Sequence, residues 1–344
     1  MLRIQEANSG LGAAVKRRQF LLCLGATLAP FAIPRGAFAQ STPVRRIGWL
    51  KAGAKEQAPE EIKAFVDALE ALGQHDGKTF TIEARFAEGD VGKLRPLADE
   101  LARSDVAVIV ATSQAAVEAA FAATKSIPIV GRMTMNPMSN GMAKTLGHPE
   151  GNVAGLYSLF EELVDRRLEL LSEAVPDLHK VGVLVTTNYA DSAYWLSQVD
   201  ASLKKRKLER YVMNVHTEAD LDSAFADAAE AGANGLIALR SPLIVASAER
   251  IAELSNSYLY RLPGIFDSRE FVDSGSFMSF GPNVAGEFRA LAGLVDKILK
   301  GAKPGDLPIE QPDKFELVIN MKAAQLIGLE VSQAVRTNAD TVIE

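Results

Sequence analysis

The side chains best suited to ligand chemistry lie directly after short apolar runs. Thr112, Ser113 and Gln114 follow the apolar run 106–111, and an alanine-rich segment typical of a helix begins immediately after them. A strand that ends where a helix begins offers free backbone N–H groups and the positive end of the helix dipole, which together favour an anionic ligand group. Serine is also a common N-cap, so Ser113 has two open interpretations, a helix cap and an anion-binding hydroxyl.

Similar polar groups follow the other apolar runs of the chain. Ligands of open parallel sheets bind outside the carboxyl ends of the strands, so these groups are candidate ligand contacts. Single members also have structural interpretations: Ser241 as a turn residue before Pro242, and Arg269 with Glu270 as a local ion pair. The groups are Gly53, 112–114, 132–134, 187–189, 240–241 and 267–270.

The patterns of the common catalytic and cofactor sites are missing. Segment 73–79 looks like a phosphate-binding loop, but it is one residue short between its glycines and lies after a helix and before a strand. His75, His148, His179 and His216 are scattered, without a second metal ligand at helical spacing. The sequence also lacks a Gly-x-Ser-x-Gly elbow. We therefore expect no metal, no cofactor and no catalytic residues.

Residues 1–39 resemble an export signal. Basic residues 16–18 precede a short apolar segment, and residues 37–39, Ala-Phe-Ala, have the small-x-small pattern of a cleavage site. The consecutive arginines, followed by x-Phe-Leu, are also typical of a twin-arginine signal, so the Sec and Tat routes both stay open. Prolines interrupt the apolar segment, which is shorter than the ~20 residues of a membrane span. We expect a periplasmic protein without membrane insertion of the mature chain.

Composition narrows the class of protein and its partners. The 344 residues, 48% of them hydrophobic, suffice for two domains of ordinary size. The single cysteine, Cys23, lies in the predicted signal, so we expect a mature chain without disulfides or thiolate sites. Removing that signal would remove five of the 37 basic residues but one of the 43 acidic residues. The resulting acidic chain would be a poor partner for nucleic acid or anionic membranes.

From residue 45 the chain alternates between apolar runs and amphipathic segments. Apolar residues recur at helical spacing in segments such as 60–72 and 284–300, whereas 181–185 is a continuous apolar run typical of a buried parallel strand. The alternation occurs twice, over 45–157 and over 181–280. It predicts an α/β fold of two Rossmann-like lobes, each a parallel sheet with helices on both faces.

These elements also suggest domain boundaries. After the signal 1–39, we predict an N-terminal lobe of residues 40–158 and 283–302 and a C-terminal lobe of residues 159–282 and 303–344. With this division the chain crosses between the lobes three times. Such connections form a hinge, and hinge closure around a ligand is a standard use of two-lobe architecture.

Other conspicuous side chains have simple structural interpretations. The acids Glu161, Glu162 and Asp165 begin a predicted helix, where negative charge complements the dipole. The basic run 204–207 ends another helix, and the same dipole argument explains it. Trp195 adds aromatic surface near the strand ends, although its helical spacing favours a core position.

Several segments together resemble one protein family. They are 46–50 (RIGWL), 81–90 (TIEARFAEGD), 268–272 with 278–282 (SREFV and MSFGP), 298–312 and 314–320 (KFELVIN). From about residue 45 to the C-terminus the chain resembles the TrpX-like substrate-binding proteins of ABC transporters, which have type I periplasmic binding protein architecture. The resemblance implies two lobes, three hinge crossovers and capture of a small solute for a membrane permease. Family members often take amino acids, including aromatic ones. Asp267 replaces a small residue of many relatives, which bears on ligand identity.

The sequence therefore predicts a non-enzymatic receptor for a small carboxylate-bearing solute, an amino acid or an aromatic acid. Ser113, with Thr112, would hold the ligand carboxylate. Asn188 and Asp267 would bind an amino or hydroxyl group, and Tyr189 would cover an apolar part. An exported cofactor-dependent enzyme and a sensory ligand-binding domain are the alternatives. The predicted contacts are Gly53, Thr112, Ser113, Gln114, Met133, Asn188, Tyr189, Ser241, Asp267 and Ser268.

Overall fold

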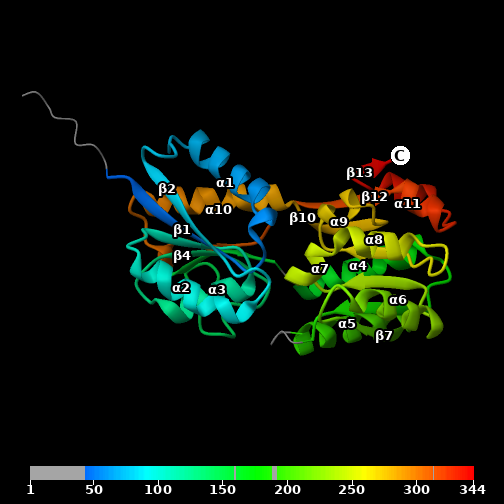
Figure 1. Cartoon of the computed structure of the whole chain (residues 1–344). Coiled ribbons are helices and arrows are strands. Elements are labelled where there is room, and N and C mark those ends of the chain that lie inside the picture. The colour runs from blue at the N-terminus through cyan, green and yellow to red at the C-terminus, as the bar shows by residue number, and fades with distance from the viewer. Residues whose placement is uncertain (1–42, 159, 188–191, 313) are drawn as a thin grey trace, which may run out of the picture. The chain divides into compact units, whose positions relative to one another are not determined.

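The computed structural model describes residues 43–158, 160–187, 192–312 and 314–344. These residues form two β-sheets, and helices cover both faces of each sheet (Figure 1). The predicted α/β fold with two Rossmann-like sheets is thus confirmed. None of the helices in these ranges has the length and apolarity of a membrane span.

The first sheet has six strands, all paired in parallel. They are β1 (Arg45–Lys51), β2 (Phe80–Phe86), β3 (Val108–Ala111), β4 (Ile129–Met133), β5 (Val153–Tyr157) and β11 (Ile309–Glu310). The order across the sheet is β11-β5-β4-β3-β1-β2, so the direction of winding reverses between β1 and β3. Such a reversal is a topological switch point, where open α/β sheets bind ligands.

The second sheet repeats this topology. Its strands are β6 (Lys180–Val185), β7 (Glu209–Asn214), β8 (Gly235–Ala238), β9 (Gly264–Phe266), β10 (Met278–Pro282), β12 (Phe315–Asn320) and β13 (Thr341–Ile343). The order β13-β12-β10-β9-β8-β6-β7 reverses between β6 and β8. The expectation of a wholly parallel sheet is wrong at β12, which is antiparallel to β10. The chain leaves this sheet at Pro282 and re-enters it opposite that residue, at Phe315, so β12 must run backwards.

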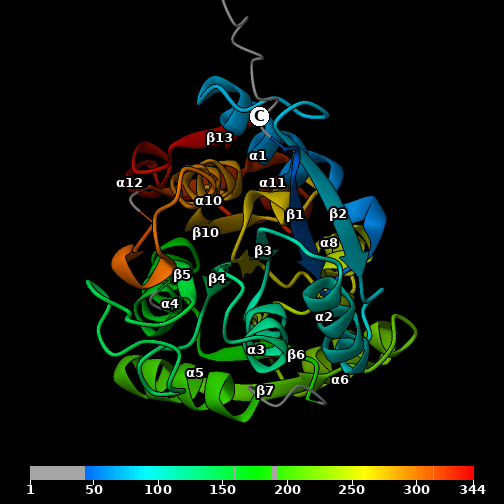
Figure 2. The ribbon, with the colours of Figure 1, turned by 90° about the vertical axis from the view of Figure 1, so that its left-hand side faces the viewer.

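Four long helices cover the first sheet (Figure 2). On one face, α1 (Pro59–Ala71) and α10 (Val284–Leu299) enclose the indole of Trp49. The Trp49 ring centroid lies 5.4 Å from that of Phe65 in α1 and 5.4 Å from that of Phe288 in α10. On the other face, α2 (Leu94–Arg103) and α3 (Gln114–Ala123) bury the second core of this sheet.

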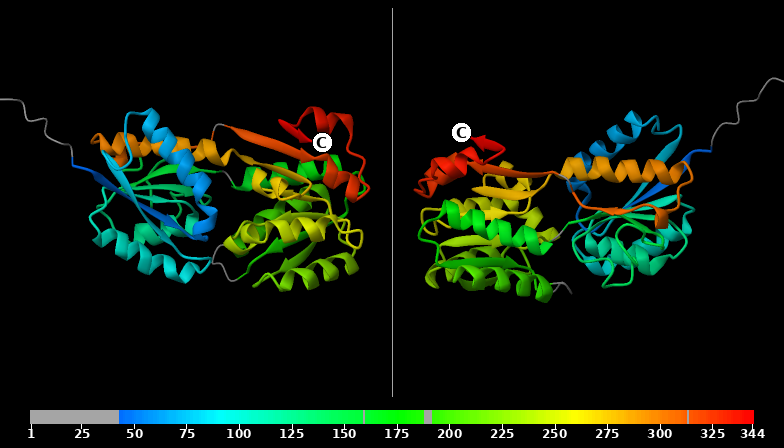
Figure 3. Two further views of the ribbon diagram at one scale, coloured as in Figure 1. Left: turned by 45° about the horizontal axis from the view of Figure 1, so that its top comes forward. Right: turned by 180° about the vertical axis from the view of Figure 1, so that it is seen from behind.

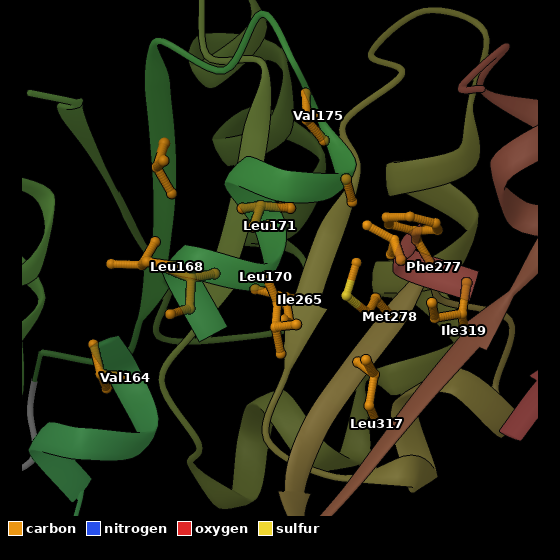
Figure 4. Packing of buried hydrophobic residues seen from close by; sticks show 14 of the residues in the cluster. Val164, Leu168, Leu170, Leu171, Val175, Ile265, Phe277, Met278, Leu317 and Ile319 are labelled. Carbon is orange, nitrogen blue, oxygen red and sulfur yellow. The ribbon is translucent and has the colours of Figure 1, made fainter. Parts of the chain in front are cut away.

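One face of the second sheet packs against α4 (Phe160–Ala174), α5 (Ser192–Arg206), α11 (Met321–Leu326) and α12 (Gln333–Thr337). Figure 4 shows the centre of this core, where Leu168 and Leu171 of α4 lie near Ile265 of β9 and Met278 of β10. All four side chains are fully buried, so α4 is fixed against the middle of the sheet.

The opposite face carries α6 (Asp220–Glu230), α7 (Pro242–Ala246), α8 (Ala248–Asn256) and α9 (Arg269–Asp273). Helices α7 and α8 are separate and meet at Ser247, which ends the first and precedes the second. Ser241 caps α7, and Pro242 occupies its first turn, where a missing N–H is tolerated.

The chain passes between the sheets three times, after β5, after β10 and after β11 (Figure 3). The predicted start of the C-terminal lobe at residue 303 is wrong, since Ile309 and Glu310 still pair with β5 of the first sheet. Ile309 is buried in the core of that sheet. A two-residue strand has no detectable periodicity, which explains why the sequence pattern missed it.

Candidate functional site

A cavity of about 190 Å³ lies at the carboxyl ends of strands from both sheets. Its lining includes residues that follow β1, β3 and β4 in the first sheet and β8 and β9 in the second. The lining therefore includes residues at strand ends next to the switch points of both sheets, where ligands of such folds bind. Pockets for drug-sized ligands measure about 300–1,000 Å³, so this cavity suits a smaller solute.

Eight of the ten predicted contacts line this cavity. The other two, Asn188 and Tyr189, lie outside the described residues. That the eight side chains bind a ligand stays a prediction. They are Gly53, Thr112, Ser113, Gln114, Met133, Ser241, Asp267 and Ser268.

Ser113 caps α3, which confirms its interpretation as a helix cap. Its Oγ accepts a hydrogen bond from the N–H of Ala116 at 3.4 Å. The hydroxyl of Thr112 donates to the carbonyl oxygen of Leu50 at 3.4 Å, which joins the ends of β3 and β1. A cap uses only an acceptor lone pair of Ser113, so its hydroxyl proton remains available to a ligand.

Gln114 and Ser241 stabilise the loops around the cavity. The Gln114 Oε1 accepts from the N–H groups of Thr134 at 3.0 Å and Met135 at 3.1 Å, which fixes the chain after β4. The Ser241 Oγ accepts from the N–H of Ile244 at 3.2 Å and lies 3.0 Å from the Oγ of Thr186. The latter contact joins the ends of β6 and β8 at the second switch point. Both side chains thus have structural roles at the site.

Lys51, at the end of β1, forms a largely buried ion pair with Glu61 of α1. Its Nζ lies 2.9 Å and 2.8 Å from the two carboxylate oxygens, and each side chain is 11% exposed. Burial lowers the pKa of Lys51, and the Glu61 charge opposes this shift. Lys51 was not among the residues predicted from the sequence.

Arg132, on β4, is paired with Glu287 near the start of α10. The Nη2 of Arg132 lies 2.5 Å from a Glu287 oxygen, and the Glu287 side chain is 2% exposed. The hydroxyl of Ser158, which follows β5, donates to the other Glu287 oxygen at 3.5 Å. Glu287, in the helix that follows the crossing after β10, is thus connected to β4 and to the crossing that follows β5.

Arg240, after β8, contacts three oxygen-bearing side chains. It lies 3.2 Å from Asp267 Oδ1, 3.0 Å from Ser268 Oγ and 3.0 Å from Glu270 Oε2. Burial lowers the pKa of Arg240, but the charges of Asp267 and Glu270 outweigh it and raise that pKa overall. The suggested local pair of Arg269 with Glu270 is wrong, because Glu270 pairs with Arg240 instead.

Arg167 also lines the cavity and was not among the residues predicted from the sequence. It belongs to α4 and is 4% exposed, and its Nε donates to the carbonyl oxygen of Phe280 at 2.7 Å. Among the described residues it forms no ion pair. Burial lowers its pKa, and the charge of Asp267 offsets this effect only in part. Its helical spacing from Val164 and Leu171 predicts a buried position, but not a position at the cavity.

Two aromatic rings form an apolar wall of the cavity. The ring centroids of Phe160 in α4 and Trp195 in α5 lie 5.8 Å apart. Trp195 contacts the core of the second sheet, as expected, but it also lines the cavity. Its buried Nε1 has no hydrogen-bond partner among the described residues. Within the same ranges, no group of three or more His, Cys, Asp and Glu side chains could hold a metal ion.

The fold and the position of the cavity define a class of protein. Two doubly wound sheets with a cavity at their switch points constitute the type I periplasmic binding protein fold. A conserved domain protein from Vibrio cholerae has this fold, with TM-score 0.79 and 24% identity over 87% of this chain and 99% of that chain. An ABC domain from Streptococcus pneumoniae, solved in complex with L-Trp, has TM-score 0.76 and 22% identity over 87% of this chain and 100% of that chain.

Sequence comparison gives the family. The model of the ABC transporter substrate-binding protein family matches residues 56–343, and this chain belongs to that family. A tyrosine-binding protein from Clostridioides difficile (strain R20291) is 26% identical over 268 residues, which are 78% of this chain and 76% of that protein. Members of the family are substrate-binding proteins and not enzymes, so the enzymatic alternative is set aside.

Proposed function

We propose that this chain is the solute receptor of an ABC importer and that it captures an aromatic amino acid or a related aromatic acid. The observation that carries the proposal is the cavity at the switch points of both sheets, which combines an aromatic wall with charged side chains. Rings of Phe160 and Trp195 would pack against an aromatic ligand, since offset or tilted ring pairs are favourable.

Two relatives support the aromatic character of the solute. The curated relative is a tyrosine-binding protein, and the pneumococcal structure contains L-Trp. These relatives identify L-tyrosine and L-tryptophan as the first solutes to test.

Capture would occur by hinge closure of two lobes, each a sheet with its helices. The three crossings between the sheets would bend during closure, and the strand ends that line the cavity would enclose the solute. The same proposal includes export through the signal in residues 1–39, a periplasmic location and delivery of the solute to the permease subunits of the transporter.

Within the cavity we assign two contacts to a zwitterionic ligand. The hydroxyl of Ser113, at the N-terminus of α3, would donate to the ligand carboxylate. Asp267 would accept from the ligand ammonium group through Oδ2, because Arg240 occupies its Oδ1. A solute that contacts both residues would connect the ends of the two sheets.

A thermal-shift titration tests the proposal. A ligand that binds only the folded state, at a concentration of 100 times its Kd, stabilises that state by about 2.7 kcal/mol. For a chain of this size we expect L-tyrosine or L-tryptophan to raise Tm by about 5 °C, and L-leucine to raise it less. No rise in Tm with either aromatic amino acid would contradict the proposed solute class.

Paired serine variants separate ligand binding from helix capping. Ser113→Ala removes a cap worth about 1 kcal/mol and also the proposed ligand contact. Ser332→Ala removes a cap of the same 3.4 Å geometry from α12, away from the cavity. We expect similar losses of stability but weaker binding of the aromatic amino acid only in Ser113→Ala. Unchanged affinity in both Ser113→Ala and Asp267→Ala would show that this assignment is wrong.

A further inference from the structure

We infer that Arg167 pairs with the carboxylate of the bound solute and makes the cavity select aromatic carboxylates over neutral aromatic molecules. The inference rests on the proposed function, because it concerns a ligand in the same cavity. It adds a residue that neither the strand-end pattern nor the comparisons identify.

Arg167 differs from the other cationic side chains of the cavity. Lys51 contacts both oxygens of Glu61, Arg132 contacts Glu287, and Arg240 contacts two acids. Arg167 contacts a backbone carbonyl oxygen instead, and it forms no ion pair with a described residue. It is the cation of the described lining for which the protein provides no direct counterion.

Its hydrogen-bonding groups are also incompletely used. A guanidinium has five N–H donors, and the bond to the Phe280 carbonyl oxygen uses the Nε donor. The four donors on the terminal nitrogens have no partner among the described residues, and the side chain lines the cavity. Such a fork matches the two oxygens of a carboxylate.

Burial makes a ligand counterion favourable. At 4% exposure Arg167 is largely withdrawn from water, and a buried charge is destabilised unless it is paired. The charge of Asp267 compensates only in part, since the pKa of Arg167 remains lowered. A carboxylate in the cavity would supply the missing charge, so its binding would offset the unfavourable burial of Arg167.

The position of Arg167 also suits an aromatic acid. Phe160 and Arg167 are seven residues apart in α4, about two helical turns, so they occupy the same side of that helix. Phe160 and Trp195 form the aromatic wall of the cavity, and Arg167 lines the same cavity. A ligand with its ring against this wall could direct its carboxylate toward the guanidinium.

The test compares a carboxylate with its uncharged amide. We would titrate L-tryptophan, L-tryptophanamide and indole-3-propionate into the wild-type chain and into Arg167→Gln by calorimetry. In the wild type we expect L-tryptophan to bind at least about 30-fold more tightly than its amide, the range for loss of a buried charged contact. In Arg167→Gln that preference should fall to within about threefold. Arg167→Lys, which keeps the charge without the fork, should restore part of it.

Arg166→Gln is the matched control. Arg166 is the preceding residue of α4, but it is 39% exposed and pairs with Glu169 and Glu173. The Arg166→Gln variant should bind L-tryptophan more tightly than its amide by the same factor as the wild type. Comparison of the carboxylate and amide within each variant also corrects for any loss of stability caused by removal of the Phe280 contact.

The outcomes distinguish the inference from the proposed function. If the wild type binds L-tryptophan and Arg167→Gln retains the 30-fold preference, the role of Arg167 is wrong and the proposed function stands. If indole-3-propionate binds in an Arg167-dependent way but L-tryptophan and L-tyrosine do not bind, the role of Arg167 is supported and the amino-acid assignment is wrong. If none of the aromatic carboxylates binds, both are overturned.

Discussion

Lys51 and Glu61 illustrate how a buried ion pair constrains the cavity wall. Both side chains are 11% exposed, and the ammonium lies within 2.9 Å of both carboxylate oxygens. Removing water from two charges is costly, so such a pair contributes little net stability compared with apolar residues. Removing only one partner leaves the other charge buried without compensation, which is strongly destabilising.

We predict that Glu61→Gln lowers the free energy of unfolding by about 3 kcal/mol, because the Lys51 charge stays buried without its counterion. Urea denaturation measures this change. Asp67→Asn is the control on the same helix, since Asp67 pairs with Lys63 at an exposed position and should change stability by less than about 0.5 kcal/mol. The double variant Lys51→Met, Glu61→Met should recover most of the loss. Equal effects of Glu61→Gln and Asp67→Asn would contradict the account of this pair.

Residue types at strand ends predicted part of the cavity lining, but not the charged side chains of Lys51 and Arg167. Ser113, Ser241 and Asp267 were selected because a strand end has a sequence signature. Arg167 comes from the middle of a helix, and only the three-dimensional packing shows that it reaches the same cavity. Ion pairs such as Arg240 with Glu270 were also unpredictable, because they join side chains 30 positions apart in the sequence.

At the scale of elements, α4 and α5 are connected by a cluster of polar contacts. The Oδ1 of Asp165 accepts from Ser202 at 2.6 Å and from Arg206 at 2.7 Å, and Lys205 lies 3.4 Å away. The sequence suggested separate dipole roles for the acids and for the basic run 204–207, whereas in the structure Asp165 pairs with Lys205 and Arg206. The Arg206 hydrogen bond holds the pKa of Asp165 well below its usual range, against the opposing effect of burial.

This pKa shift predicts a pH-dependent contribution to stability. Because the folded pKa of Asp165 is depressed, its stabilising effect is complete at neutral pH and declines as pH falls below the ordinary value of about 4. We predict that Asp165→Asn is less stable than the wild type by about 1 kcal/mol at neutral pH, a value reduced because the side chain is 35% exposed. Thermal unfolding across pH should show this difference shrinking in acid. A difference that is constant with pH would contradict the electrostatic origin.

Glu169→Gln provides the control for Asp165→Asn. Glu169 lies on the same helix and pairs with the exposed Arg166. Its replacement should change stability by less than about 0.5 kcal/mol at neutral pH. An effect as large as that of Asp165→Asn would show that any acid of α4 stabilises the helix in the same way.

Long elements with clear periodicity were predictable, and short ones were not. The strands and helices of both doubly wound units follow from alternation of apolar runs with amphipathic segments. Helix α9 has five residues and β11 has two, so neither is long enough for an apolar pattern to repeat several times. The reversed direction of β12 depends on where the chain re-enters the second sheet, and local sequence carries no signal for it.

At the scale of the whole molecule, the repeated topology explains why one cavity collects residues from both sheets. Each sheet has its own switch point, and the strand ends from both contribute to the same lining. Two of the crossings are also joined, because the N–H of Asn283 donates to the carbonyl oxygen of Lys314 at 3.2 Å. Movement at one crossing would therefore be transmitted to the other, as the proposed hinge closure requires.

The two tryptophans offer a direct view of the cavity. Trp49 is fully buried between Phe65 and Phe288, whereas Trp195 lines the cavity wall. The sequence contains no other tryptophan, so selective excitation of indole reports on these two positions alone. An aromatic solute in the cavity would alter the surroundings of Trp195 and leave those of Trp49 unchanged.

The most direct test of the central claim is a titration of L-tyrosine monitored by tryptophan fluorescence, in the wild type and in Trp195→Phe. The account predicts a saturable change of emission in the wild type that is lost in Trp195→Phe, while calorimetry shows that the variant still binds L-tyrosine. A fluorescence change that persists without Trp195, or calorimetric binding to the wild type without any fluorescence change, would show that the solute does not occupy this cavity.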